Sequence, residues 1–143
     1  MMTSLTTNRL LVADDDRFIR ELISRNLPAE NLEIECVPSG EAALERIGQD
    51  HFDAVILDVH MEGMTGPETI DRIREVDSLV PIMIVTGDHS IETERKARHR
   101  DVFYYFVKPL DLAEIRDVVD SAIHSRRAQA SDPPGSNRSR NQR

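Results

Sequence analysis

The sequence predicts an α/β protein: a three-layer doubly wound (βα)5 sandwich built on a five-stranded parallel sheet. Short apolar runs, typical of strands buried on both faces, alternate with segments whose apolar residues recur at helical spacing. Strands joined by helices run parallel with right-handed crossovers, so helices are expected on both faces of the sheet. The length of 143 residues suits one domain with a substantial core.

The strands are predicted from apolar runs and from one alternating segment. The most continuous run, Ala-Val-Ile-Leu-Asp at 54–58, ends in a carboxylate. Leu32, Ile34 and Cys36 alternate with glutamates, which is typical of a strand with one polar face. In chain order, the expected strands cover residues 10–13, 32–36, 54–58, 81–86 and 103–107.

The helices are predicted from apolar periodicity and from residues that begin or end helices. Pro28 ends the first helix, and Ser39 is the expected N-cap of the second. Pro67 suits the first turn of the third helix, and Asp111 with Glu114 resembles a capping box at the last. The expected helices begin near residues 18, 40, 67, 90 and 111. The helix over 90–100 carries few apolar side chains and is expected to be weak and mostly solvated.

Composition restricts the compartment and the partners. The chain has 18 Lys and Arg against 26 Asp and Glu, a formal net charge of -8, which argues against nucleic acid as a partner. A single cysteine, Cys36, excludes an internal disulfide, suits a reducing compartment and is interpreted as a small buried hydrophobe. Neither a signal peptide nor an apolar stretch of about 18 residues is recognisable, so we expect a soluble, cytoplasmic protein.

Changes in composition suggest three parts of the chain. Residues 1–8 form a polar lead-in, 9–127 the domain, and 128–143 a tail that contains Pro, Ser and Arg without periodicity. Such a composition is typical of disorder. The tail is interpreted as a solubilising or docking segment, with nucleic-acid binding as the alternative.

Polar side chains follow the ends of four expected strands. Asp14 and Asp15 follow the first, Asp58 ends the third, Thr86 ends the fourth and Lys108 follows the fifth. The carboxyl ends of parallel strands meet at one edge of the sheet, where such folds bind ligands. Three ionised carboxylates share a pocket only when a cation neutralises them, and a hard divalent ion, Mg²⁺ above all, suits oxygen ligands.

The same set of residues indicates phosphoryl chemistry. A carboxylate such as Asp58 is a candidate nucleophile that takes a phosphoryl group. Lys108 offers a point charge and Thr86 a hydroxyl donor to phosphoryl oxygens. Considered alone, Asp58 has another interpretation, a cap of the turn that follows its strand.

Four segments resemble the receiver domain of two-component response regulators, in the stand-alone form with the flavodoxin-like fold of the chemotaxis regulator. They are residues 12–16 with Ile19-Arg20, 52–58 with Met61 and Gly66, 84–87, and 105–109. The resemblance spans about residues 9–125. It implies that a sensor histidine kinase or a phosphotransfer protein phosphorylates Asp58. No output domain follows in this sequence, so we expect the signal to pass to a protein partner or the phosphoryl group to be handed on.

The resemblance also implies a set of metal ligands. Asp15 would contact Mg²⁺ (or Mn²⁺) directly, and Asp14 would act mainly through water. Asp58 and the main-chain carbonyl of His60 would complete the protein's ligands, whereas the imidazole of His60 would not bind the metal.

Further residues match the switch of the family. Thr86 matches the hydroxyl that moves toward the phosphoryl group, and Tyr105 the aromatic ring that turns inward behind it. The alternative interpretation of Tyr105 is an ordinary core or surface aromatic residue. His60 and Asp88 flank the expected phosphoryl position and should tune the lifetime of the phosphorylated state.

The sequence departs from the family's pattern in two places. Glu62 stands where a proline often follows the methionine of the acceptor loop, so we expect a more mobile and more acidic loop. Asp101-Val102 replaces the usual Gly-Ala pair before the fifth strand, which leaves the geometry of that turn open. Lys108-Pro109 does match, and this pair is often cis in the family.

Three hypotheses about function follow. The first is a single-domain response regulator that is not an enzyme and that can pair with a second copy through the fourth helix, fifth strand and fifth helix. The second is a haloacid-type phosphatase, but Phe18 stands where that family needs a hydroxyl or small residue. The third is a pseudo-receiver, an interaction module that is not phosphorylated.

Overall fold

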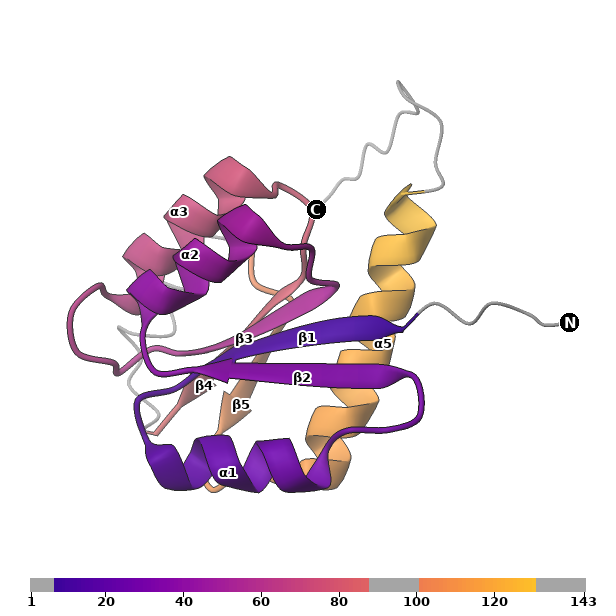
Figure 1. Ribbon diagram of the computed structural model, residues 1–143, viewed down its shortest axis with the longest axis horizontal. Coiled ribbons are helices and arrows are strands. Elements are labelled where there is room, and N and C mark those ends of the chain that lie inside the picture. Colours follow the sequence, from indigo (N-terminus) through magenta and orange to yellow (C-terminus); the bar gives the residue numbers. More distant parts are fainter. Residues whose placement is uncertain (1–6, 88–100, 131–143) are drawn as a thin grey trace, which may run out of the picture.

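The computed structural model describes residues 7–87 and 101–130 and shows one sheet of five parallel strands between layers of helices (Figure 1). The strand order is β2-β1-β3-β4-β5, which is the order of a doubly wound sheet. The strands are β1 (Asn8–Ala13), β2 (Leu32–Val37), β3 (Ala54–Asp58), β4 (Ile82–Thr86) and β5 (Tyr104–Val107). The chain turns from one side of β1 to the other between β2 and β3, so the switch point lies between β1 and β3.

Helices cover both faces of the sheet, as the sequence predicts (Figure 1). They are α1 (Arg17–Asn26), α2 (Gly40–Gln49), α3 (Gly66–Val76) and α5 (Leu112–Ala130). In Figure 1, α2 and α3 lie on one face of the sheet, and α1 and α5 on the other. The predicted helix over 90–100 lies outside the described residues. Among those described, no helix is both long enough and apolar enough to span a bilayer.

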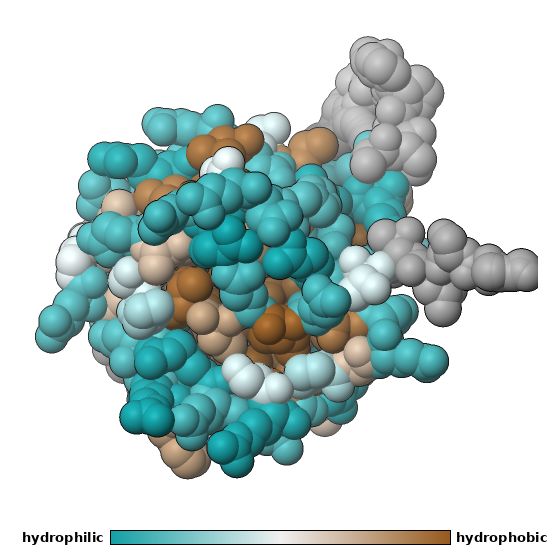
Figure 2. Space-filling model, viewed as in Figure 1, coloured by the Kyte–Doolittle hydropathy of each residue, from teal (hydrophilic) through white to brown (hydrophobic). Residues whose placement is uncertain are grey.

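The central strand β3 contributes to the apolar core on both faces of the sheet. Val55 and Leu57 belong to the core beneath α2 and α3, whereas Ala54 and Ile56 belong to the core beneath α1 and α5. All five residues of β3 are buried, which confirms the interpretation of the apolar run as a doubly covered strand. At the edge strand β2 the cover is thinner, and apolar surface gathers there between α1 and α2 (Figure 2).

The helix starts confirm one expected cap and revise another. The Ser39 hydroxyl accepts a hydrogen bond from the backbone of α2, and Thr65 caps α3 in the same way. Asp111 accepts from two backbone amides at the start of α5. The predicted capping box is wrong in its second half, because the Glu114 carboxylate instead accepts a hydrogen bond from the Tyr104 hydroxyl at 2.6 Å.

The C-terminal boundary differs from the sequence prediction. Helix α5 continues to Ala130, so residues 128–130 are helical rather than part of the tail, and 131–143 lie outside the described residues. Two contacts hold the last turns of this helix to the domain. Arg126 binds Asp77 at 3.0 Å, and Arg127 donates to the side chain of Asn8.

The turn before β5 keeps a glycine-like conformation without glycine. Asp101 has φ of 63°, in the left-handed region, and is the one described residue other than glycine that does. Its main-chain carbonyl accepts a hydrogen bond from Arg74 at 3.1 Å. The replacement of the Gly-Ala pair is therefore accommodated with local backbone strain, and the turn still leads into β5.

Candidate functional site

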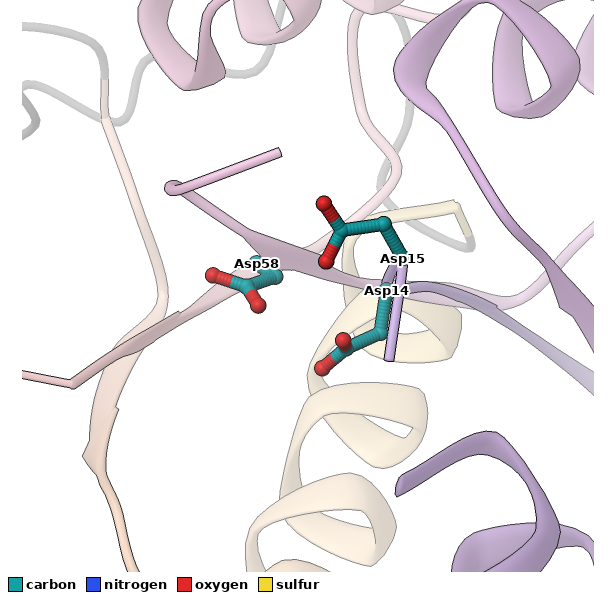
Figure 3. Close-up of side chains that lie close together, drawn as sticks. All are labelled: Asp14, Asp15 and Asp58. Atoms are coloured by element: carbon teal, nitrogen blue, oxygen red, sulfur yellow. The ribbon is translucent and has the colours of Figure 1, made fainter. Parts of the chain in front are cut away.

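Three carboxylates meet at the carboxyl edge of the sheet, beside its switch point (Figure 3). Asp58 is the last residue of β3, and Asp14 and Asp15 directly follow the neighbouring strand β1. One oxygen from each carboxylate lies within 4.8 Å of the others. Asp14 and Asp58 are each 2% exposed, whereas Asp15 is open to solvent. The structure thus brings together the acidic set that the sequence predicts.

Backbone groups and one arginine orient the two buried carboxylates. The amide of Asp16 donates to Asp14 Oδ1 and the amide of His60 donates to Asp58 Oδ1, both at 2.9 Å. Arg20, one turn into α1, donates to the main-chain carbonyl of Asp14 at 2.8 Å. These bonds fix the peptide from which Asp14 and Asp15 project and hold the Asp58 carboxylate at the strand end.

The third aspartate of the run has a different role. The Asp16 carboxylate accepts a hydrogen bond from the backbone amide of Phe18 at 2.9 Å and so acts as the N-cap of α1. The cap uses this side chain at the helix start, whereas Asp14 and Asp15 join the cluster with Asp58. This agrees with the expectation that the acidic pair is Asp14 and Asp15.

Lys108 supplies positive charge to the site. Its ammonium lies 3.0 Å from Asp58 Oδ2 and 3.9 Å from Asp14 Oδ2. The Lys108 backbone amide also donates to the carbonyl of Thr86 at 2.9 Å, which joins the ends of β4 and β5. The Lys108-Pro109 bond is cis, as the resemblance implies.

The pKa values of two groups show how crowded the site is. Burial raises the pKa of Asp14 to about 6; the hydrogen bond from the Asp16 amide opposes this shift, and the charge of Asp58 adds to it. Burial lowers the pKa of Lys108, but the hydrogen bond and charge of Asp58 outweigh that effect, so the net pKa is raised. Negative charge in this pocket is therefore costly in the absence of a further cation.

The donor set suits a hard divalent ion. Asp14, Asp15 and Asp58 offer only oxygen atoms, which are the ligands that Mg²⁺ and Mn²⁺ take from carboxylates. A bound dication would also offset burial and the charge of Asp58, which both raise the pKa of Asp14. The chemistry of the residues therefore fits a metal ion at this position.

The remaining predicted residues lie around this cluster or outside the described part of the chain. Thr86 is half-buried at the end of β4, and the side chain of His60 is exposed. Tyr105 packs against the core beneath α2 and α3 with a buried hydroxyl oxygen, so its ring lies inward. Asp88 lies outside the described residues.

Sequence reasoning overlooked two residues that support the site. The sequence gives Arg20 no role beyond its place in a matched segment, although an arginine one turn into the next helix can reach back to the main chain of the acidic pair. Glu41, in the first turn of α2, accepts a hydrogen bond from the backbone amide of Met64 in the loop after β3. No pattern in the sequence connects these two segments.

Fold and site together define an α/β protein with a cluster of three aspartates and a lysine at the switch point of its sheet. Residues 10–120 match the family described as response regulator receiver domain. Because the match covers most of the chain, this protein belongs to the receiver domain family. Such domains bind Mg²⁺ at an acidic pocket and interact with histidine kinases or phosphotransfer proteins in two-component systems.

Individual relatives and solved structures agree with this assignment. The response regulator MprA of Mycolicibacterium vanbaalenii is 34% identical over 107 residues, which cover 75% of this chain and 46% of the relative. The regulatory protein AtoC of Escherichia coli is 29% identical over 81% of this chain and 25% of its own length. The chain thus spans less than half the length of these curated relatives.

Among solved structures, the chemotaxis protein CheY4 of Vibrio cholerae aligns with a TM-score of 0.76 at 26% identity, covering 82% of this chain and 99% of CheY4. A CheY-like receiver domain protein from Methanospirillum hungatei aligns with a TM-score of 0.82 at 20% identity, over 87% of this chain and 99% of that protein. The second likeness shows the shared fold alone.

Proposed function

We propose that this chain is a phospho-acceptor of two-component signal transduction. It receives a phosphoryl group on Asp58 from a sensor histidine kinase or a phosphotransfer protein and signals through a protein partner. One observation carries the proposal: the buried Asp58 carboxylate lies 3.0 Å from the Lys108 ammonium and within the cluster formed with Asp14 and Asp15.

The site residues support a transfer in which Asp58 is the nucleophile. A carboxylate oxygen of Asp58 forms the bond to phosphorus while the bond from phosphorus to the donor atom breaks, and the electron pair leaves with the donor. The amide of His60 holds the other carboxylate oxygen, and Lys108 offsets negative charge on the phosphoryl oxygens.

Mg²⁺ (or Mn²⁺) is the proposed cofactor. Asp15 and Asp58 would hold it directly with the main-chain carbonyl of His60, and Asp14 mainly through water. When bound, the ion offsets the charge of the carboxylates and of the incoming phosphoryl oxygens. The oxygen-only donor set and the raised pKa of Asp14 support this assignment.

Thr86 and Tyr105 are the proposed switch. The phosphoryl group brings about two negative charges and new acceptor oxygens, and the Thr86 hydroxyl at the end of β4 is suited to donate to one of them. Its movement would stabilise the inward position of Tyr105, whose hydroxyl oxygen is already buried. The side chains of His60 and Asp88 would tune the lifetime of the phosphorylated state.

The other parts of the proposal concern compartment, partners and enzymatic activity. We place the protein in the cytoplasm, without a membrane or nucleic-acid partner, and propose that it is not an enzyme. Use of Asp16 as a helix cap and the presence of Phe18 both count against a haloacid-type phosphatase. The homodimer through the fourth helix, β5 and α5 stays a prediction that sedimentation with and without phosphorylation would test.

Intact-mass spectrometry after incubation with acetyl phosphate and Mg²⁺ tests the central step. We expect one base-labile phosphoryl group on the wild type, none without Mg²⁺ and none on Asp58→Asn. Asp117→Asn, an exposed aspartate on α5, is the matched control and should be phosphorylated like the wild type.

Two other results would replace the proposal. An unmodified wild type that steadily releases phosphate from monoesters would indicate the phosphatase. A wild type that takes no phosphoryl group from acetyl phosphate or candidate kinases and releases no phosphate would indicate a pseudo-receiver.

A further inference from the structure

We propose that Glu41 of α2 is a positioning residue for the acidic site. Its carboxylate binds the part of the β3–α3 loop that lies between the two anchored ends, and thereby restrains the main chain that leads on from His60. The inference rests on the proposed function in one respect, the role of the His60 carbonyl as a metal ligand. The contact between Glu41 and the loop is independent of that role.

The loop over residues 59–65 is anchored at both ends but not in its middle. At its start, the amide of His60 donates to Asp58, and the side chains of Val59 and Met61 are buried. At its end, Thr65 caps α3. The intervening Glu62, which stands where the family often has proline, is exposed, so its side chain offers little restraint.

Glu41 contacts the loop in its unanchored part. Oε2 of Glu41 accepts a hydrogen bond from the backbone amide of Met64 at 3.2 Å. The same carboxylate lies against Gly63, where a Cβ atom would approach Oε2 to 2.8 Å. Gly63 also has φ of 89°, a conformation that side chains disfavour. The carboxylate therefore fits against the glycine. This contact opposes the greater loop mobility that the sequence predicts from Glu62.

The rest of α2 gives Glu41 a firm base. Glu41 lies in the first turn of the helix, next to the Ser39 cap, where the helix dipole favours a carboxylate. Helix α2 also packs closely against α3 beside Glu41, since a Cβ atom at Gly40 would lie 2.5 Å from the hydroxyl oxygen of Thr69 in α3. Because α2 and α3 have little room to shift, a bond from Glu41 limits the conformations of the loop.

This restraint should appear in metal affinity. A loop that is already ordered loses less conformational freedom when a metal ion binds. Loss of the Glu41 contact should therefore weaken metal binding even though every metal-binding group is still present. Loss of a hydrogen bond made directly to a ligating group typically lowers metal affinity by about tenfold or more. Glu41 acts one step further out, through the backbone of the loop. We therefore expect Glu41→Ala to raise the Kd for Mg²⁺ by about three- to tenfold, the effect of ordering the loop alone.

Calorimetric titration of the full chain with Mg²⁺ is the first test. Glu41→Gln retains an oxygen acceptor and should bind Mg²⁺ nearly as well as the wild type. Glu45→Ala removes another exposed glutamate from the same helix and should leave the Kd unchanged. With acetyl phosphate, Glu41→Ala should need more Mg²⁺ for half-maximal phosphorylation but reach the wild-type rate at saturating Mg²⁺.

Two further measurements keep the contact itself testable. Amide hydrogen exchange in metal-free protein should be faster at Met64 in Glu41→Ala than in Glu41→Gln or the wild type. In a double-mutant cycle, Gly63→Ala should destabilise Glu41→Ala less than the wild type, because the close approach to the carboxylate is gone.

An unchanged Kd in a folded Glu41→Ala variant would overturn the positioning role, as would equal losses in Glu41→Ala and Glu45→Ala. If Glu41→Ala does not fold, a Kd for Glu41→Gln more than about tenfold above that of the wild type would count against the role. If the wild type itself binds no Mg²⁺, the metal assignment and the positioning role both fail, and Met64 exchange shows whether the contact survives as a structural one.

Discussion

The two ends of the central sheet carry similar side chains in opposite electrostatic states. At the carboxyl end, Asp14 and Asp58 are buried beside Asp15 and Lys108. At the other end, Arg9 lies 2.7 Å from Asp50 and 3.3 Å from Glu35, and Arg46 binds the same two carboxylates. Both guanidinium groups also lie over the Phe52 ring, at 4.7 and 5.8 Å from its centroid. We call Arg9, Glu35, Arg46, Asp50 and Phe52 the arginine cluster.

The pKa values of two aspartates express the difference. Burial raises the pKa of Asp14 to about 6, whereas the hydrogen bond from Arg9 lowers the pKa of Asp50 to about 2. In the arginine cluster, cations stabilise the carboxylates that they bind. In the acidic site, negative charge is in excess over the Lys108 ammonium, and a ligand with positive charge is needed to balance it. Such an imbalance of charge among buried groups at the strand ends is typical of functional sites rather than of structural ion pairs.

Addition of Mg²⁺ should have the largest effect on stability, and this effect should depend on the acidic site and not on the arginine cluster. A ligand that binds only the native state at a hundredfold excess over its Kd raises the free energy of unfolding by about 2.7 kcal/mol. Urea unfolding of the wild type should show this gain with Mg²⁺ and not with KCl at equal ionic strength. Asp15→Asn should lose most of it, whereas a variant of the arginine cluster should keep it. A gain of the same size in Asp15→Asn would place the ion elsewhere.

Removal of Lys108 should have the next largest effect. In Lys108→Met, the carboxylates of Asp14 and Asp58 remain buried without their ammonium partner. Breaking a buried pair costs roughly 3–5 kcal/mol, and we expect about 2 kcal/mol because the lysine side chain is 29% exposed. Metal-free urea unfolding at neutral pH measures this loss. Arg17→Met, whose side chain is 82% exposed, is the control and should change stability little. Equal losses in both variants would contradict the assignment.

The pH dependence of the metal-free protein should follow Asp14. Its pKa rises from 3.8 in the unfolded chain to about 6 in the native state, so the native state binds this proton more tightly. Stability from this group is therefore present at low pH and is lost as pH rises from about 4 to about 6. The full linkage of this pKa shift is about 3 kcal/mol.

Urea unfolding of wild type and Asp14→Asn across this range isolates the effect, because the variant lacks the titrating group. A constant difference between the two proteins would show that the pKa of Asp14 is not raised. Asp50 should behave in the opposite way: its lowered pKa gives stability that is present above pH 3.8 and is lost as pH falls toward 2.

The smallest effect is expected in the arginine cluster. Arg46→Met removes one of the two guanidinium groups that bind Glu35 and Asp50, and Arg9 and water still stabilise these carboxylates. We therefore expect a loss of stability smaller than that in Lys108→Met. Thermal unfolding measures the loss, and salt should diminish it. Mg²⁺ affinity and phosphorylation of Asp58 should be unchanged. A change in either would show that the two ends of the sheet are coupled.

Local patterns in the sequence determined most of the fold and the composition of the site. Apolar runs predict strands because burial on both faces demands them, and all five predicted strands within the described residues are present. The run at 54–58 coincides with β3, and its terminal Asp58 lies where the pattern predicts. Parallel strands share one polarity, so residues at their carboxyl ends must meet. The positions of Asp14, Asp15 and Asp58 at the strand ends were therefore enough to predict the acidic cluster.

Only the tertiary structure decided how these side chains are held. Lys108 and Asp58 are 50 residues apart, and Glu41 and Met64 are 23 apart, so neither hydrogen bond follows from a local pattern. Glu114 likewise accepts a hydrogen bond from Tyr104 on β5 and not from the start of its own helix. The extension of α5 to Ala130 also depends on contacts with distant segments. The helical connections between strands set the direction in which the strands run. The packing of helices on the sheet selects the partner of each polar group, because a buried donor or acceptor bonds to the group that lies within reach.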